Sequence, residues 1–179
     1  IPKSGSIKVL RQEISTLSRS GRDAFRVNHI GFIFQLFNLL PYLSIQENVM
    51  LPLRFSKVRA DRAGKTKNDR LNEAQRLLKA LGLEEQQTEK NPVIELSVGQ
   101  QQRAAVARAL IGSPEIVIAD EPTSALDSGN RDRFIELLFR ETDDQGSTLV
   151  FVSHDEHIAR QFERVVHLDQ INQKGTGNR

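Results

Sequence analysis

Residues 116–121 read IVIADE, a continuous apolar run that ends in two carboxylates, Asp120 and Glu121. Such a run predicts a strand covered on both faces, as in a parallel sheet, and open parallel sheets bind ligands where their strands end. Successive strand residues point in opposite directions, so one carboxylate can serve a metal while its neighbour faces another target. Mg²⁺ prefers one or two carboxylates with phosphate oxygens and waters, which suits the acidic half of a nucleotide-hydrolysis site. The alternative is a strand end whose acids are merely solvated.

Strands and helices alternate on either side of this run. Downstream, the pattern predicts a helix over 134–139, a buried strand over 148–152, a helix over 158–162 and a final strand over 165–168. Upstream, it predicts a short strand over 5–10, a polar helix over 20–29 and a buried strand over 30–34. The β-α-β-α-β order of the C-terminal half indicates an α/β fold with a parallel sheet and right-handed crossovers.

The middle of the chain, 45–112, has no convincing strand and is interpreted as a helical insertion. Ser44 and Glu47 form a capping box, which predicts a helix start. Apolar spacing predicts further helices over 71–81 and 97–111. Residues 55–68 are strongly basic and lack an apolar period, so we expect a solvated loop or a helix end there.

The composition bounds the class of protein. The 179 residues suit one domain, and 25 basic against 23 acidic residues give a net charge of +2, which does not indicate a nucleic-acid partner. The absence of Cys excludes a disulfide scaffold, a thiolate metal site and a Cys nucleophile. No apolar run approaches the roughly 20 residues of a membrane span. The sequence starts at Ile1 and its only Met is Met50, so we expect it to begin inside a longer protein.

Two further motifs lie where chemistry is expected. Residues 152–155 (VSHD) end the next predicted strand, so His154 can lie near Asp120 and Glu121. Ser97 and Gln100 form a capping box, with a glycine between them that permits close approach. Free N–H groups at a helix start suit a phosphate. The alternative is only a well-made helix start.

In combination, these motifs resemble those of the nucleotide-binding domain of an ABC transporter, in the family's order and over nearly the whole chain. Residues 32–35 (FIFQ) resemble the Q-loop, 96–100 (LSVGQ) the signature, 116–121 the Walker B strand with its catalytic Glu, 124–127 (SALD) the D-loop, and His154 the switch histidine. Residues 38–41 (NLLP), 47–53 (ENVMLPL) and 100–103 (QQQR) are most similar to the subfamily that works with lipoprotein-releasing and macrolide-efflux-type permeases.

The resemblance implies a P-loop NTPase-like ABC ATPase core, a mostly parallel sheet with flanking helices. Residues 1–179 would be a single nucleotide-binding domain, and 45–112 its helical insertion with the signature. The implied cofactors are ATP and Mg²⁺. Asp120 would hold the metal through water, and Glu121 would be the general base for the attacking water. His154 would contact the γ-phosphate.

The resemblance implies that the remaining site residues link the site to the helical insertion or to a second nucleotide-binding domain. Gln35 would touch the metal or the attacking water and link the site to the insertion. Ser97, Gly99 and Gln100 would reach the γ-phosphate bound on a second nucleotide-binding domain, in a head-to-tail homodimer. Asp127 would lie in that dimer interface.

The implied partners are this second domain and an integral membrane permease, with no nucleic acid, which places the chain on the cytoplasmic face of the cell membrane. The permease's coupling helix would dock on residues 36–42, which are unusually apolar for a loop. Pro41 prevents this stretch from continuing a helix or a central strand. The alternative is that these side chains pack under the insertion.

Two features depart from the family pattern. Val98 stands where the signature has Gly, and because a β-branched residue resists positive φ, we expect a weakened phosphate contact. The phosphate-binding pattern G-x-x-x-x-G-K-[ST] is absent, since Arg59 precedes the Gly64-Lys65-Thr66 triplet by five residues. In the family this loop lies upstream of the element that 5–10 resembles, so we expect it before Ile1.

Other functions remain as alternatives. The missing loop leaves open the alternative of a degenerate or truncated, non-catalytic domain that binds a partner but not ATP by itself, beside the leading hypothesis of an ATP-hydrolysing transporter subunit. A DNA-maintenance ABC ATPase is disfavoured, because only residues 36–95 separate the Q-loop from the signature, without sustained heptads. The basic run that begins at Lys57 is either a solvated face or a membrane-headgroup contact. His29, His157 and His167 show no metal-ligand spacing.

Overall fold

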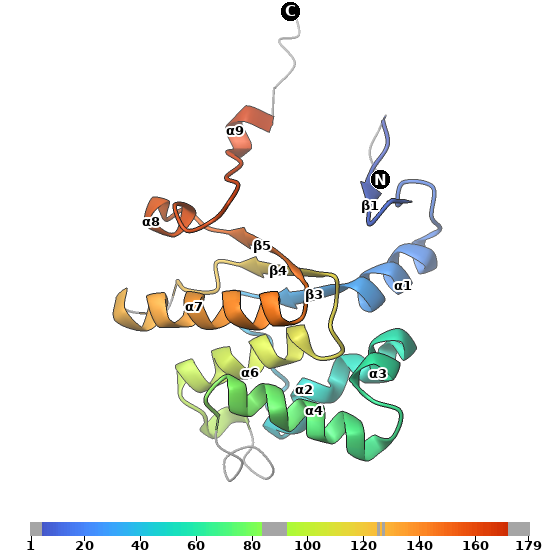
Figure 1. Cartoon of the computed structure of the whole chain (residues 1–179), viewed down its shortest axis with the longest axis vertical. Coiled ribbons are helices and arrows are strands. Elements are labelled where there is room, and N and C mark those ends of the chain that lie inside the picture. The colour runs from blue at the N-terminus through green and yellow to red at the C-terminus, as the bar shows by residue number, and fades with distance from the viewer. Residues whose placement is uncertain (1–4, 84–92, 125, 127, 172–179) are drawn as a thin grey trace, which may run out of the picture.

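The strand that ends in Asp120 is the central strand of a parallel sheet. The computed structural model describes residues 5–83, 93–124, 126 and 128–171. Within these residues the main sheet has the order β3 (Ile30–Ile33), β4 (Ile116–Asp120), β5 (Thr148–Val152). The strands expected over 30–34, 116–121 and 148–152 are therefore confirmed. The register pairs Ile33 with Ala119 and Ala119 with Phe151, so all three strands end at one edge (Figure 1).

The described residues also form helices. They are α1 (Arg19–His29), α2 (Ile45–Phe55), α3 (Lys57–Ala63), α4 (Lys67–Ala80), α6 (Val98–Leu110), α7 (Ser128–Asp144), α8 (Glu156–Ala159) and α9 (Leu168–Ile171), with a 3₁₀ turn, η1 (Val93–Glu95). The described residues of 45–112 contain helices and no strand. Among the described residues, no helix combines the length and the apolar character needed to cross a bilayer.

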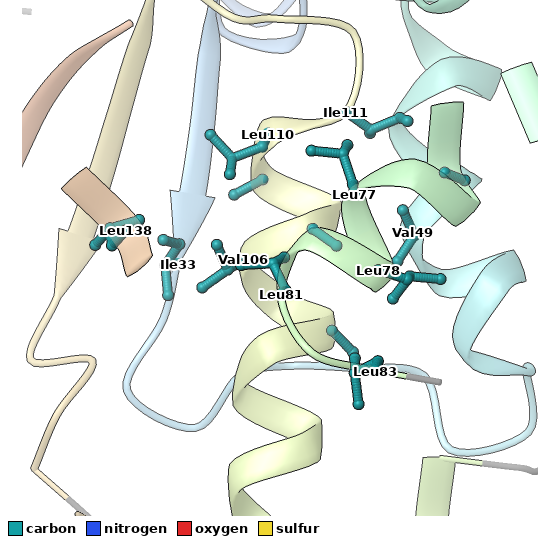
Figure 2. Packing of buried hydrophobic residues seen from close by; sticks show 14 of the residues in the cluster. Ile33, Val49, Leu77, Leu78, Leu81, Leu83, Val106, Leu110, Ile111 and Leu138 are labelled. Carbon is teal, nitrogen blue, oxygen red and sulfur yellow. The ribbon is translucent and has the colours of Figure 1, made fainter. Parts of the chain in front are cut away.

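The two faces of the sheet differ in burial. Ile33 and Ala119 are fully buried and belong to one core with side chains of α6 and α7. Figure 2 shows Ile33 between Leu138 of α7 and Val106 of α6. On the opposite face, the side chains of Val150 and Val152 of β5 are 45% and 42% exposed. The sheet therefore packs on α6 and α7 through the face that carries Ile33 and Ala119.

The helical part is held by local caps and by the same core. Ser44 and Glu47 form the expected capping box at the start of α2. Leu77 and Leu78 of α4 are buried and lie toward α6 and α2, with Val49 of α2 beside Leu78 (Figure 2). The helical spacing over 71–81 thus predicted the buried stripe correctly.

The basic stretch 55–68 is not a solvated loop, so that alternative was wrong, although α2 and α3 both end within the stretch. It folds into α3 and the start of α4, and Arg59 is 3% exposed. The Arg59 guanidinium donates to the carbonyls of Ile111 (2.6 and 2.8 Å) and Ala109 (2.7 Å), which α6 leaves unpaired at its end. Burial lowers the pKa of Arg59 to about 10. The buried, charged side chain of Arg59 therefore caps the C-terminal end of α6.

Other cations of this stretch are also engaged within the chain. Arg62 donates to Glu115 (2.6 Å), and His29 lies 3.0 Å from the other oxygen of the same carboxylate. Arg70 donates to the carbonyls of Ala60 and Gly64. The basic run from Lys57 to Arg70 has six basic residues, and three of them, Arg59, Arg62 and Arg70, therefore serve contacts within the chain.

The strand expected over 165–168 was wrong, and the short strand expected over 5–10 is confirmed only in part. Residues 165–168 are not a strand but exposed chain leading into α9, because no described strand lies beside them to pair with. Residues 5–10 contain only β1 (Lys8–Val9), which pairs antiparallel with β2 (Gln12–Glu13) in a separate small ribbon. Leu10 and Arg11 both have positive φ, 50° and 64°, and turn the chain back on itself there.

Candidate active site

The two carboxylates at the end of β4 have different surroundings. Asp120 is exposed, on the same face of β4 as Ile118. Glu121 follows with a φ of 46°, and its N–H donates to the carbonyl of Val152 (3.0 Å), which continues the pairing with β5. This left-handed conformation is rare for a residue with a side chain and turns Glu121 out of the strand path.

Glu121 and His154 are in direct contact, as expected from the parallel strands. Glu121 Oε1 lies 2.7 Å from His154 Nδ1, and the His154 side chain is 85% exposed while that of Glu121 is 23% exposed. The hydrogen bond to Glu121 and its negative charge raise the pKa of His154. The histidine therefore binds its proton more tightly than a free imidazole, and the carboxylate is held at the sheet edge.

An ion pair that sequence reasoning missed fixes the loop carrying His154. Asp155 Oδ1 accepts from the His157 N–H (2.8 Å) at the start of α8, and Oδ2 accepts from Arg131 of α7 (2.7 Å). The backbone hydrogen bond and the Arg131 charge lower the pKa of Asp155. The sequence offers no local signal for this pair, since 24 residues separate its members.

Gln35 lies in a turn directly after β3. The Phe37 N–H donates to the carbonyl of Phe34 (2.9 Å), which makes Gln35 and Leu36 the central residues of the turn. Ile33 pairs with Ala119 in the sheet, so Gln35 stands two residues beyond β3 as Glu121 stands two residues beyond Ala119. Gln35 is exposed at the same edge as the two carboxylates.

The signature-like residues form the N-terminus of α6. Ser97 Oγ accepts from the Gln100 N–H (3.3 Å), and Gln100 Oε1 accepts from the Ser97 N–H (2.9 Å), so the helix-start interpretation is realised. Val98 is the first residue of α6 and has no positive φ, so its branching is compatible with the backbone, and the weakened phosphate contact expected from Val98 stays a prediction. A Cβ added to Gly99 would meet no atom within 4 Å, so packing inside the chain does not require this glycine.

A second missed residue connects α6 to the sheet edge. Gln102 is 1% exposed, and its amide donates to the carbonyl of Pro122 (2.6 Å), the residue after Glu121. Its position four residues before Val106, on the buried side of the helix, was the available signal. Gln102 therefore positions the chain that leaves β4.

The residues at this edge fit a magnesium ion. Over the described ranges, no three His, Cys, Asp or Glu side chains gather into a metal cluster, so a closed protein cage is not present there. The exposed carboxylate of Asp120 matches the single protein ligand that Mg²⁺ takes when phosphate oxygens and waters supply the others. Asp127 lies outside the described residues.

The triplet Gly64-Lys65-Thr66 is the junction of α3 and α4. Gly64 ends α3 with a φ of 152°, and Thr66 caps α4, with its hydroxyl accepting from the Asp69 N–H (3.1 Å). Local structure accounts for the outer residues of the triplet without a phosphate.

Comparisons with known proteins agree with this architecture. The macrolide export ATP-binding/permease protein MacB of Shigella flexneri is 41% identical over 165 residues, covering 92% of this chain and 24% of MacB. The lipoprotein-releasing system ATP-binding protein LolD of Syntrophotalea carbinolica is 42% identical, covering 93% of this chain and 70% of LolD. The dimeric ATP-binding cassette MJ0796, in a post-hydrolysis state bound to ADP and Pi, is 39% identical with a TM-score of 0.74, covering 89% of this chain and 66% of that one.

The sheet order, the acid-ended central strand and the structural likeness define a P-loop NTPase-like α/β protein of the ATP-binding cassette kind. The sequence profile described as "ABC transporter" matches residues 1–124. The chain belongs to the ABC transporter family, and relatives of both the lipoprotein-releasing and the macrolide-export type resemble it. It spans 24% of the length of MacB.

Proposed function

We propose that this chain is the ATP-binding part of an ABC transporter, which couples ATP hydrolysis in a head-to-tail dimer to transport by a membrane permease. The observation that carries the proposal is the contact of Glu121 with His154 beside the exposed Asp120, at the carboxyl edge of the sheet. Gln35 ends the neighbouring strand at the same edge.

Glu121 is the general base in this proposal. A base must lie within hydrogen-bond reach of the proton it takes, and Glu121 is held at the sheet edge by its own backbone and by His154. Because Glu121 raises the pKa of His154, the histidine keeps its proton nearer to neutral pH and can face the γ-phosphate as a cation. When bound by Asp120, Mg²⁺ would neutralise charge on the phosphates.

The N-terminus of α6 is the contact to the partner's phosphate. Its free N–H groups and the positive end of the helix dipole suit an anion. The space around Gly99 admits a phosphate that a side chain would obstruct. The dimeric cassette of similar structure supports a paired arrangement. The role proposed for Asp127 is in the interface of that pair.

The permease would dock on the segment after Gln35 and hold the chain at the cytoplasmic face of the membrane. Leu36 and Tyr42 are 82% and 76% exposed, whereas Phe37 is buried. Leu39 packs against the core. Phe37 and Leu39 thus pack inside the chain, as one alternative for 36–42 expected. The exposed side chains of Leu36 and Tyr42 are the docking surface in this proposal.

The test uses an extended domain, in which a segment with the pattern G-x-x-x-x-G-K-[ST] from a relative precedes Ile1. Glu121→Gln should lower the ATP hydrolysis rate at least about 100-fold, because the amide cannot accept the proton, while ATP binding persists. The matched control is Glu136→Gln on the exposed side of α7, which should hydrolyse ATP like the parent. Unchanged turnover in the Glu121→Gln protein refutes the proposal.

A further inference from the structure

The segment after Gln35 has an unusual backbone. Phe37 and Asn38 have φ values of 59° and 50°, two consecutive residues with side chains in the left-handed region. This conformation is sterically unfavourable and persists only where the surroundings impose it. Two turn hydrogen bonds close the segment, from the Phe37 N–H to the Phe34 carbonyl (2.9 Å) and from the Asn38 N–H to the Leu36 carbonyl (2.6 Å), and the second matches the positive φ of Phe37.

Arg108 adds a constraint on this backbone from α6. Its guanidinium donates from Nη1 to the carbonyl of Asn38 (2.6 Å) and from Nη2 to the adjacent carbonyl of Phe37. Two neighbouring carbonyls match the planar fork of an arginine. The side chain is largely buried, and burial lowers the pKa of Arg108. Asn38 itself is exposed, so water could satisfy its carbonyl; the arginine fixes the geometry.

The other end of the segment is held by α2. Asn48 is fully buried, and its Oδ1 accepts from the Leu40 N–H (2.7 Å) while its Nδ2 donates to the carbonyls of Leu40 (3.0 Å) and Ser44 (3.0 Å). The backbone is thus fastened at two points while the side chain of Tyr42 stays exposed.

We propose that Arg108 is a positioning residue that fastens the Gln35 turn to the last part of α6, so that α6 and Gln35 move together. Gln35 lies two residues before Phe37, and Ser97 lies at the opposite end of the helix, about 15 Å from Arg108. The catalytic role of Gln35 and the phosphate contact at Ser97 rest on the proposed function. A displacement at the phosphate-binding end of α6 is carried by the helix to Arg108 and from there to Gln35.

The chain contains its own probe for this fastening. Tyr42 is the only tyrosine and there is no tryptophan, so intrinsic emission reports on this segment. In Arg108→Met, which keeps an apolar stem but no donors, we expect lower Tyr42 anisotropy and roughly tenfold faster hydrogen exchange at the Phe37 amide. The matched control is Arg103→Met: Arg103 is an exposed arginine of α6, contacts Gly82 at 3.4 Å and should leave both readouts unchanged.

Each result decides the proposal. Wild-type exchange and anisotropy in Arg108→Met overturn it, as does an equal effect of Arg103→Met. If Arg108→Met does not fold, Arg108→Lys carries the test: severalfold faster exchange supports the fork, and wild-type exchange overturns it.

The extended domain separates the fastening from the proposed function. Arg108→Lys should lower kcat severalfold and leave the KM for ATP nearly unchanged, because the residues that bind nucleotide are intact. An unchanged kcat together with faster exchange overturns the link to Gln35. If the wild-type extended domain itself hydrolyses no ATP, the proposed function fails, while the exchange experiment still decides the fastening.

Discussion

Gly31 of β3 allows the end of α6 to lie directly against the sheet. A Cβ at this position would stand 2.2 Å from the carbonyl oxygen of Ala109 and 2.9 Å from its carbon. Contact between a carbon and an oxygen needs about 3.3 Å, so Gly31→Ala must move the helix by about 1 Å. Both atoms are backbone and cannot rotate away. The same oxygen accepts from Arg59 at 2.7 Å, and the displacement also stretches that bond.

The sign of the effect tests this reasoning. In the absence of a clash, replacing glycine in a strand by alanine stabilises by about 0.5–1 kcal/mol. Overpacking costs about 1–3 kcal/mol, and the strained Arg59 contact adds to it. We therefore expect Gly31→Ala to lower the unfolding free energy by about 2 kcal/mol, and Tm by roughly 4–8 °C in a chain of this length. Urea unfolding followed by circular dichroism measures it.

Gly99→Ala on α6 is the matched control. The added Cβ meets nothing within 4 Å, and alanine favours a helix, so stability should rise by about 0.5 kcal/mol. A Gly31→Ala protein as stable as the parent, or more stable, would refute the close approach of α6 to β3. Equal destabilisation by both substitutions would refute the distinction between the two glycines.

Three further expectations follow from the site and its surroundings. Proton NMR should give His154 a pKa above its ordinary value, because the Glu121 carboxylate stabilises the protonated ring, and this pKa should fall back in Glu121→Gln. The same His154 pKa in the parent and in Glu121→Gln would show that the two side chains are not in contact. In the extended domain, Leu36→Asp with Tyr42→Asp should keep ATP hydrolysis but abolish co-purification with the permease, and unfolding of this double variant would show that the pair is core. Burial raises the pKa of Glu115, but hydrogen bonds from its basic neighbours outweigh burial and lower this pKa to about 2. The ionised carboxylate therefore stabilises the fold above its ordinary pKa, and this stabilisation is lost as the pH falls from 4.5 toward 2. Glu115→Gln should make the unfolding free energy depend less on pH in that window, and an unchanged dependence would contradict the assignment.

The strands and helix starts could be predicted because their signals are local. The apolar run 116–119 needs no distant partner to be identified as a buried strand. The capping boxes at Ser44 and Ser97 close within four residues and form as the sequence indicates. The proximity of Glu121 and His154 follows from parallel strands alone, since neighbouring strands of such a sheet end at one edge.

The errors arise where a residue's environment is made by distant chain. Arg59 is indistinguishable in sequence from a solvated cation, because the Ile111 carbonyl that it caps lies 52 residues downstream. The same holds for Arg108, whose acceptors are 70 and 71 residues away. The apolar residues 165–168 satisfy strand propensity, but a strand forms only beside another, and the described residues offer none.

Helix α6 connects stability to the proposed function because its two ends have opposite requirements. Its C-terminal end is fixed by Gly31 and by Arg59, and there a small steric change should be costly. Its N-terminal end carries its own capping box and leaves open space at Gly99. A chain selected for stability alone would place alanine at position 99, since a glycine inside a helix is unfavourable. The glycine is therefore best explained by a group from outside the chain, and Gly99→Ala should separate the two demands by raising stability while weakening the contact with the partner's phosphate.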